Sequence, residues 1–257
     1  LLLTFKLSLA QTGWFWQNPK PQGSTLNDVV CINASQIIAI GDGGAVLKSG
    51  DGGVNWNVKY IFPSSDKKTD KLISLFCFDE TNFAILSSSG IYMTSYNIMK
   101  TSDGGATWNK YLIDSLLSQS RFEKIIFTDN NTGWAFNCTY YEPFTYRTTN
   151  GGVNWQRYSI NGRQDLSNVF FINQNTGWIR LDLNNEYYRT TNRGNNWTLN
   201  TAPASFTLPY FINQYTGWIL GGSFKTTNGG DTWNQMSTTI DVPKNYAFIN
   251  ENTGWCI

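Results

Sequence analysis

The residues that could do chemistry in this chain are carboxylates, tyrosines and arginines, because its 257 residues include no histidine. That absence excludes Ser-His-Asp and Cys-His catalysis, general acid–base catalysis by imidazole, and zinc held by histidine. Glycoside hydrolysis needs only a pair of carboxylates, or, in sialidases, a tyrosine nucleophile beside an arginine cluster. The 18 acidic residues could supply a pair by chance, and the arginines are Arg121, Arg147, Arg157, Arg163, Arg180, Arg189 and Arg193.

The most regular placement of acids and amides is an octet, hydroxyl-x-Asp/Asn-x-Gly-x-x-Trp, which occurs five times. Three copies carry neutral Asn, which a cation site would not favour. We therefore expect a structural turn in which the Asp or Asn accepts backbone N–H groups just ahead of it and the earlier hydroxyl bonds back. The fixed positions are Asp51, Asp103, Asn150, Asn192 and Asn228, followed by Trp56, Trp108, Trp155, Trp197 and Trp233.

The glycines of the octet are not equivalent. The second is present in every copy, as Gly53, Gly105, Gly152, Gly194 and Gly230, which predicts a positive φ there. Arg193 replaces the first glycine in one copy, so that position accepts a side chain.

A second pattern, a strand, a tight turn and Thr-Gly-Trp, precedes the octet. Its aligned Asn or Asp residues recur every 37 to 50 residues, at Asn33, Asp79, Asp129, Asn173, Asn213 and Asn250. That period fits the four-stranded antiparallel blade of a β-propeller. The sequence therefore predicts an all-β propeller of six or seven blades, and the partial last repeat predicts an incomplete chain.

The expected blades cover residues 26–61, 72–113, 122–160, 166–200 and 206–237, with a partial blade at 244–257 and a closing strand at 14–18. Residues 1–10 are apolar and end in Ser-x-Ala, which predicts the remnant of a secretory signal before a propeller at 11–257. We expect a secreted, periplasmic or cell-surface protein. No stretch is long and apolar enough to predict a membrane span.

Composition favours a turn-rich β protein, with 14% charged residues and a net charge of +1. That balance predicts no nucleic-acid partner. The cysteines, Cys31, Cys77, Cys138 and Cys256, lie in separate repeats, so we expect isolated buried thiols, with a disulfide between neighbouring blades left open. No pattern predicts a metal or cofactor site, and we expect a monomer.

Variable hairpin tips are the expected binding positions, because loops at the faces of a rigid scaffold carry recognition. They are the hairpin near Tyr92–Tyr96, the tip with Tyr140 and Tyr141, and the segment with Arg180, Tyr187 and Tyr188. Exposed tyrosine and arginine there would suit a protein or glycan partner.

The octet resembles the Asp-box, or BNR repeat, and a fuller pattern resembles one family. Leu26–Val30, Gly41–Gly44, Lys48–Gly53 and the Thr-Gly-Trp turns are similar to the photosystem II stability/assembly factor family, and Trp14–Pro19 looks like its secreted bacterial members. This resemblance implies a non-enzymatic binding scaffold, which in photosynthetic members binds membrane-protein subunits. The alternative is an Asp-box glycoside hydrolase, sialidase-like or xyloglucan-cleaving, although the Arg-Ile-Pro signature of sialidases is absent.

Overall fold

The computed structural model describes residues 25–62, 70–89, 95–114, 122–137, 144–159, 166–181, 186–201, 209–219, 223–237, 246–251 and 253–256. These residues form five four-stranded antiparallel sheets and one two-stranded sheet, which confirms the predicted all-β propeller architecture. No helix in these ranges could span a membrane. The signal-like residues 1–10, the closing strand at 14–18, and Tyr140 and Tyr141 lie outside the described residues.

We number the four-stranded sheets as blades one to five. Blade one comprises β1 (Leu26–Cys31), β2 (Ile37–Gly41), β3 (Ala45–Ser49) and β4 (Asn57–Tyr60). Blade two comprises β5 (Lys71–Cys77), β6 (Phe83–Ser89), β7 (Ser95–Thr101) and β8 (Asn109–Asp114). Blade three comprises β9 (Phe122–Phe127), β10 (Gly133–Asn137), β11 (Phe144–Thr148) and β12 (Gln156–Ser159).

Blade four comprises β13 (Leu166–Phe171), β14 (Gly177–Leu181), β15 (Glu186–Thr190) and β16 (Thr198–Thr201). Blade five comprises β17 (Tyr210–Phe211), β18 (Gly217–Ile219), β19 (Phe224–Thr226) and β20 (Asn234–Gln235). The two-stranded sheet comprises β21 (Tyr246–Asn250) and β22 (Thr253–Cys256). In every four-stranded sheet the strands pair in chain order.

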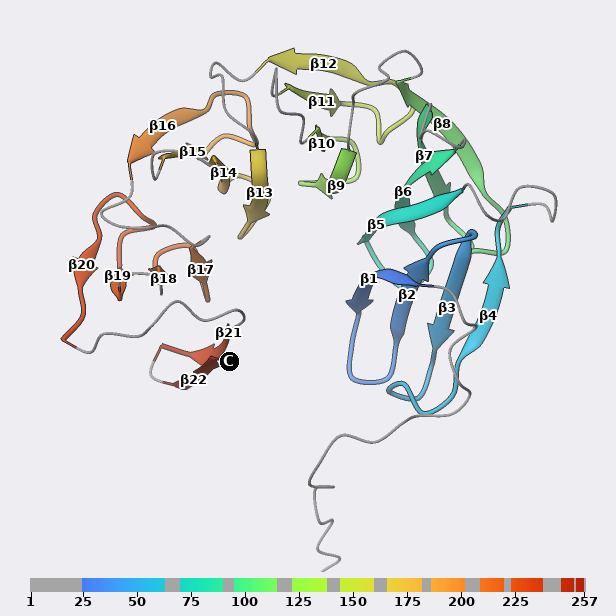
Figure 1. Ribbon diagram of the computed structural model, residues 1–257, viewed down its shortest axis with the longest axis horizontal. Coiled ribbons are helices and arrows are strands. Elements are labelled where there is room, and N and C mark those ends of the chain that lie inside the picture. Colours follow the sequence, from blue (N-terminus) through green and yellow to red (C-terminus); the bar gives the residue numbers. More distant parts are fainter. Residues whose placement is uncertain are drawn as a thin grey trace, which may run out of the picture.

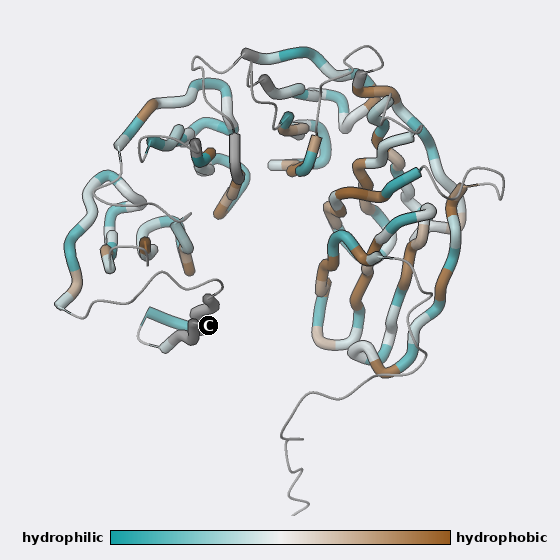
Figure 2. The backbone as a smooth tube through the Cα atoms, in the orientation of Figure 1, coloured by the Kyte–Doolittle hydropathy of each residue, from teal (hydrophilic) through white to brown (hydrophobic). Residues whose placement is uncertain are grey.

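The blades follow one another around an arc, with the first strand of each blade innermost and the fourth at the outer edge (Figure 1). The arc is open between the sheet of β21 and β22 and blade one (Figure 1). Hydrophobic segments occur in the strands of every blade (Figure 2). Because a blade inside the arc has a neighbour on each face, consecutive residues of one strand are buried, as Ala84, Ile85 and Leu86 are in β6.

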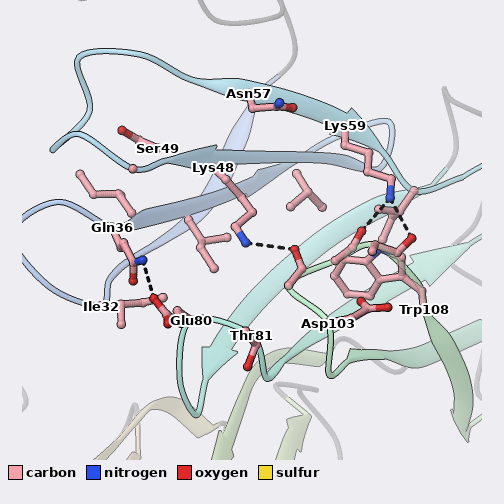
Figure 3. Close-up of a pocket in the computed structure, with 18 residues that line it drawn as sticks. Ile32, Gln36, Lys48, Ser49, Asn57, Lys59, Glu80, Thr81, Asp103 and Trp108 are labelled. Atoms are coloured by element: carbon pink, nitrogen blue, oxygen red, sulfur yellow. Dashed lines mark hydrogen bonds between the residues drawn. The ribbon is translucent and has the colours of Figure 1, made fainter.

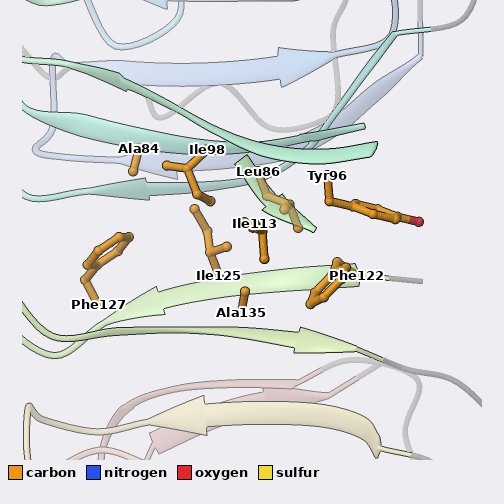
Figure 4. Packing of buried hydrophobic residues seen from close by; sticks show 9 residues of the cluster. All are labelled: Ala84, Leu86, Tyr96, Ile98, Ile113, Phe122, Ile125, Phe127 and Ala135. Atoms are coloured by element: carbon orange, nitrogen blue, oxygen red, sulfur yellow. The ribbon is translucent and has the colours of Figure 1, made fainter. Parts of the chain in front are cut away.

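The apolar core consists of clusters between neighbouring blades rather than one central mass. Between blades two and three, Leu86 and Ile98 pack against Ile125 and Ala135 (Figure 4). Tyr96 belongs to the same cluster and is 2% exposed, so the expectation of an exposed tip up to Tyr96 was wrong. The strands β6 and β7 have seven residues each, against five in β2 and β3, and the longer strands extend the buried sheet.

Polar side chains on the innermost strands tie successive blades together. The pairing of the first two strands shifts register between Leu26 and Asp28, and again between Leu72 and Ser74. The residue after each shift accepts a backbone N–H of the next blade, from Leu75 to Asp28 Oδ2 at 2.9 Å and from Ile125 to Ser74 Oγ at 3.4 Å. Lys124 of blade three returns to Asp28 Oδ2 at 3.3 Å, so one carboxylate joins three blades.

The cysteines differ from the expectation of uniformly buried thiols. Cys31 and Cys77 are both free, but Cys31 is exposed, because it lies in the first strand of the first blade on the open side of the arc. Cys77, at the corresponding position of blade two, packs beside blade one. Burial raises the pKa of the Cys77 thiol to about 12, so this sulfur stays protonated at neutral pH.

Candidate binding site at the blade junctions

The octets form the turn that the sequence predicts. In blade two, Thr101 Oγ1 accepts the Gly105 N–H at 2.8 Å and donates to Asp103 Oδ1 at 2.7 Å, and Thr107 N donates to Asp103 Oδ1 at 2.9 Å. The corresponding bonds from the residue four positions on reach Asp51, Asn150, Asn192 and Asn228 at 2.8 to 3.0 Å. An amide oxygen and a carboxylate oxygen therefore do the same work, which explains why the repeats exchange Asp for Asn.

Each octet is also anchored to the first hairpin of its own blade. The N–H of the residue after the Asp or Asn donates to a carbonyl of that hairpin, from Gly151 to Asn131 at 2.7 Å and from Gly229 to Tyr215 at 2.8 Å. Gly52, Gly104 and Arg193 make the same bond at 2.8, 2.9 and 3.0 Å. The octet and the Thr-Gly-Trp hairpin are thus one structural unit.

Hydrogen bonds hold the octet carboxylates in their charged form. Donation from the Thr107 hydroxyl and N–H, with Thr101, holds the pKa of Asp103 well below its usual range. The backbone and side chain of Asn55 likewise lower the pKa of Asp51. No group of three or more acidic, cysteine or histidine side chains among the described residues is arranged to hold a metal ion.

Both octet glycine positions adopt positive φ, whereas the repeat pattern predicted this only for the second. Arg193 therefore sits at φ 62°, a conformation that costs an L-residue about 1–2 kcal/mol. Its guanidinium bonds Asn175 Oδ1 and Asp129 Oδ2, each at 3.1 Å, and so joins hairpins of blades three and four. These contacts offset the strain.

Sequence reasoning missed a basic residue that precedes the hydroxyl of every octet. These residues are Lys48, Lys100, Arg147, Arg189 and Lys225. Three of them reach the octet of the following blade: Lys48 Nζ donates to the Gly104 carbonyl at 3.0 Å, Lys100 Nζ to the Gly151 carbonyl at 2.5 Å, and Arg189 pairs with Asp231. The presence of a basic residue before the hydroxyl in all five octets was a signal available in the sequence.

A cavity of about 660 Å³ opens at the junction of blades one and two (Figure 3). That volume falls in the usual range for small-ligand pockets. Isoleucines and Val46 supply apolar wall, and Gln36, Lys48, Lys59, Glu80 and Asp103 supply polar groups. Figure 3 shows Glu80 beside Gln36 at one end and Lys59 beside Trp108 at the other.

A second cavity of about 400 Å³ occupies the equivalent place at the junction of blades two and three. Its lining includes Lys100, Asn109, Tyr111 and Asn130, which correspond in the repeat to Lys48, Asn57, Lys59 and Glu80 of the first cavity. Repetition at consecutive junctions shows that the cavity follows from the blade geometry, while the residues at each copy decide its chemistry.

The binding residues expected at the tip of blade four are not exposed. Tyr187 and Tyr188 lie within β15 and are 2% and 5% exposed, so the prediction of exposed tyrosines there was wrong. Tyr188 packs toward blade three and Tyr187 toward blade five, because blade four is covered on both faces. Arg180 lies in β14 opposite Tyr187, half-buried, and its Nε has no hydrogen-bond partner among the described residues.

The sheets, octet turns and junction cavities define a β-propeller built from repeated blades. No protein-family model matches the chain, and no curated protein matches it. Among solved structures it is similar to YCF48 from Cyanidioschyzon merolae, a photosystem II assembly factor, with 15% identity, a TM-score of 0.56, and coverage of 94% of this chain and 95% of that one.

Enzymes share the same architecture. An ancestral GH74 enzyme matches with 18% identity and a TM-score of 0.58 over 89% of this chain, and Niastella koreensis GH74 with 19% identity and a TM-score of 0.56 over 82%. The match spans 33% and 37% of those enzymes. At these identities the likeness is one of fold, so the function must be argued from the site.

Proposed function

We propose that this protein is a non-enzymatic binding scaffold that receives its partner at the blade junctions. The observation that carries the proposal is the 660 Å³ cavity between blades one and two, which combines apolar walls with amide and charged groups. The octet carboxylates support it, because donors of their own turns already occupy them. A rigid repeated frame with a chemically distinct pocket suits recognition.

Site-specific photocrosslinking tests where a partner sits. A photoreactive phenylalanine replaces Asn57, which lines the cavity on the outer strand of blade one, and the full chain is irradiated in extract of the producing cells. Asn234, at the same repeat position of blade five, provides the matched control. We expect one discrete crosslinked species from position 57, competed by excess unmodified protein, and none from 234. No competed species from position 57 would overturn the junction assignment.

A hydrolase assay tests the non-enzymatic part of the proposal. We expect the full chain to release no product from xyloglucan or from a fluorogenic sialoside. Turnover of either substrate that a single carboxylate substitution abolishes would establish the glycoside hydrolase alternative instead.

A further inference from the structure

The octet tryptophan at the first junction lacks a hydrogen bond that two of its counterparts make. Trp56 Nε1 donates to the Gly53 carbonyl at 2.9 Å, and Trp155 Nε1 donates to the Gly152 carbonyl at 3.0 Å. Trp108 Nε1 is buried and has no partner among the described residues. A buried N–H without an acceptor is energetically unfavourable, so the missing acceptor of Trp108 needs a structural explanation.

The cause lies in the neighbouring blade. Lys59 Nζ extends from β4 to the Gly105 carbonyl at 2.7 Å, the acceptor that Trp108 would use, and to the Ala106 carbonyl at 2.9 Å. At the junction of blades three and four, Tyr158 occupies the repeat position of Lys59, and its hydroxyl donates to the Asn195 carbonyl at 2.9 Å, one residue after Gly194; Trp197 Nε1 has no partner among the described residues. At the first junction, a side chain from the preceding blade thus occupies the carbonyl that the indole would use.

The two lysines of the first cavity bond only neutral oxygens. Lys48 and Lys59 donate to backbone carbonyls and form no ion pair within the described ranges. The acidic groups that line the cavity have other partners, since Gln36 Nε2 bonds Glu80 at 2.5 Å and Asp103 accepts from its own turn. The cavity therefore holds two ammonium groups whose present acceptors are weaker than a carboxylate.

We propose that the cavity between blades one and two binds a carboxylate attached to an apolar group. Lys59 leaves the Gly105 carbonyl for the carboxylate, and Trp108 Nε1 takes over that carbonyl as Trp56 and Trp155 do in their own octets. The exchange replaces a neutral acceptor by an anionic one and satisfies a buried donor. Ile38, Val46 and Ile61 receive the apolar group.

This inference rests on the proposed binding function and specifies its ligand chemistry. A free carboxylic acid and the carboxyl terminus of a polypeptide both present that chemistry. Hexanoate and N-acetyl-leucine therefore serve as probes for the two sources, with hexanamide and N-acetyl-leucinamide as uncharged counterparts of nearly the same shape.

The experiment follows the indole N–H resonances of the full ¹⁵N-labelled chain during titration, with the Trp108 signal assigned from Trp108→Phe. We expect at least one carboxylate to shift the Trp108 signal saturably and to bind at least tenfold more tightly than its amide. Lys59→Met should weaken that binding at least tenfold and move the free-state Trp108 signal toward the ligand-bound position. Lys110→Met, which removes the same charge from an exposed position on β8, should change neither result.

The outcomes separate the ligand chemistry from the wider binding function. Binding of N-acetyl-leucine alone would point to a polypeptide terminus, and binding of hexanoate would show that a free acid suffices. Equal affinity for acid and amide, undiminished binding by Lys59→Met, or no saturable shift would overturn the proposal. If no probe gives a saturable shift but position 57 still gives a crosslink that excess unmodified protein competes away, the scaffold function stands and its ligand has a different chemistry.

Discussion

At the scale of single residues, the repeated carboxylates stabilise turns. Asp79 accepts from the side chains of Thr81 and Asn82 and from both backbone N–H groups, at 2.7 Å in each case. These donors, the Thr81 hydroxyl foremost, hold the pKa of Asp79 well below its ordinary value, as Thr107 does for Asp103. Both carboxylates are thus more acidic in the folded chain than in the unfolded chain.

The pH dependence of stability follows from that difference. A carboxylate with a depressed folded-state pKa contributes stability above its unfolded pKa of about 4 and loses it as the pH falls toward the folded pKa. We expect the midpoint of thermal unfolding to fall between pH 5 and pH 2, and to fall less in the double variant Asp79→Asn/Asp103→Asn, because Asn keeps one acceptor oxygen for each turn without titrating. The midpoints are measured by circular dichroism. An equal fall in the unmodified protein and in the double variant would contradict the assignment of this pH dependence to Asp79 and Asp103.

Arg193 sets backbone strain against contacts between blades. Arg193→Gly removes the strain at φ 62° and also the bonds to Asp129 and Asn175, so we expect a net change within about 1 kcal/mol. Arg193→Ala loses the same bonds and keeps the strain, so it should be roughly 1 kcal/mol less stable than Arg193→Gly. Urea unfolding of the two variants gives this comparison, and the reverse order would show that Arg193 is not strained.

At the scale of elements, the innermost strands depend on acceptors supplied by the preceding blade. Asp28→Ala leaves the Leu75 N–H in β5 without its acceptor, which should cost about 1–3 kcal/mol of unfolding free energy. Asp28→Asn can keep an acceptor oxygen for the Leu75 N–H. It loses the ion pair with the half-exposed Lys124 and the exposed bond from the Val29 N–H, so we expect a loss under about 1 kcal/mol. Equal losses from the two variants in urea unfolding would assign the effect to charge instead.

The strands themselves could be predicted because apolar alternation and Gly or Asn turns mark their ends. In blade one, Gly43 and Gly44 lie between β2 and β3, and the octet turn at Asp51–Gly53 lies between β3 and β4. The burial of Tyr187 could not be predicted from the two-residue alternation of a β-strand, since that alternation assumes that one face of the sheet is solvated. A blade covered on both sides buries both faces, and only the neighbouring blades reveal this.

At the scale of the whole molecule, the position of a blade in the arc decides what the same residue contributes. Val29 and Val169 occupy equivalent positions in β1 and β13, yet they are 57% and 7% exposed. Val169 packs against blade three, whereas Val29 lies in β1 of blade one, the blade beside the opening of the arc (Figure 1). Val29 and Val169 therefore differ in burial and not in residue type.

The matched substitutions Val29→Ala and Val169→Ala test that arrangement. We expect Val169→Ala to cost about 2 kcal/mol, from two lost methyl groups and the space they leave, and Val29→Ala to change stability by less than about 0.5 kcal/mol. Chemical denaturation of both variants provides the comparison. A Val29→Ala loss as large as that of Val169→Ala would show that another sheet covers blade one in solution.

The junction site illustrates what lay beyond sequence reasoning. The basic residue before each octet is visible in the repeat, but the contacts of Lys48, Lys100 and Arg189 lie in the following blade, 56 residues away in the case of Lys48 and Gly104. The competition between Lys59 and Trp108 depends on how two blades meet, and no local pattern encodes it. The propeller scaffold could therefore be predicted from the repeats, whereas the side-chain contacts between neighbouring blades could be found only from the arrangement of the blades in the structure.

The anchoring of the octets also governs how this protein ages chemically. Asn150-Gly151 and Asn228-Gly229 are sequences prone to deamidation, in which the glycine nitrogen attacks the asparagine side chain, ammonia leaves, and the cyclic imide hydrolyses to aspartate or isoaspartate. In the folded octet each glycine N–H is bound to a hairpin carbonyl and each asparagine oxygen holds its own turn, so neither partner is free to react. Isoaspartate at Asn150 and Asn228 should therefore accumulate only in molecules whose blades three or five have opened, and its level at these two positions in stored protein would record past unfolding.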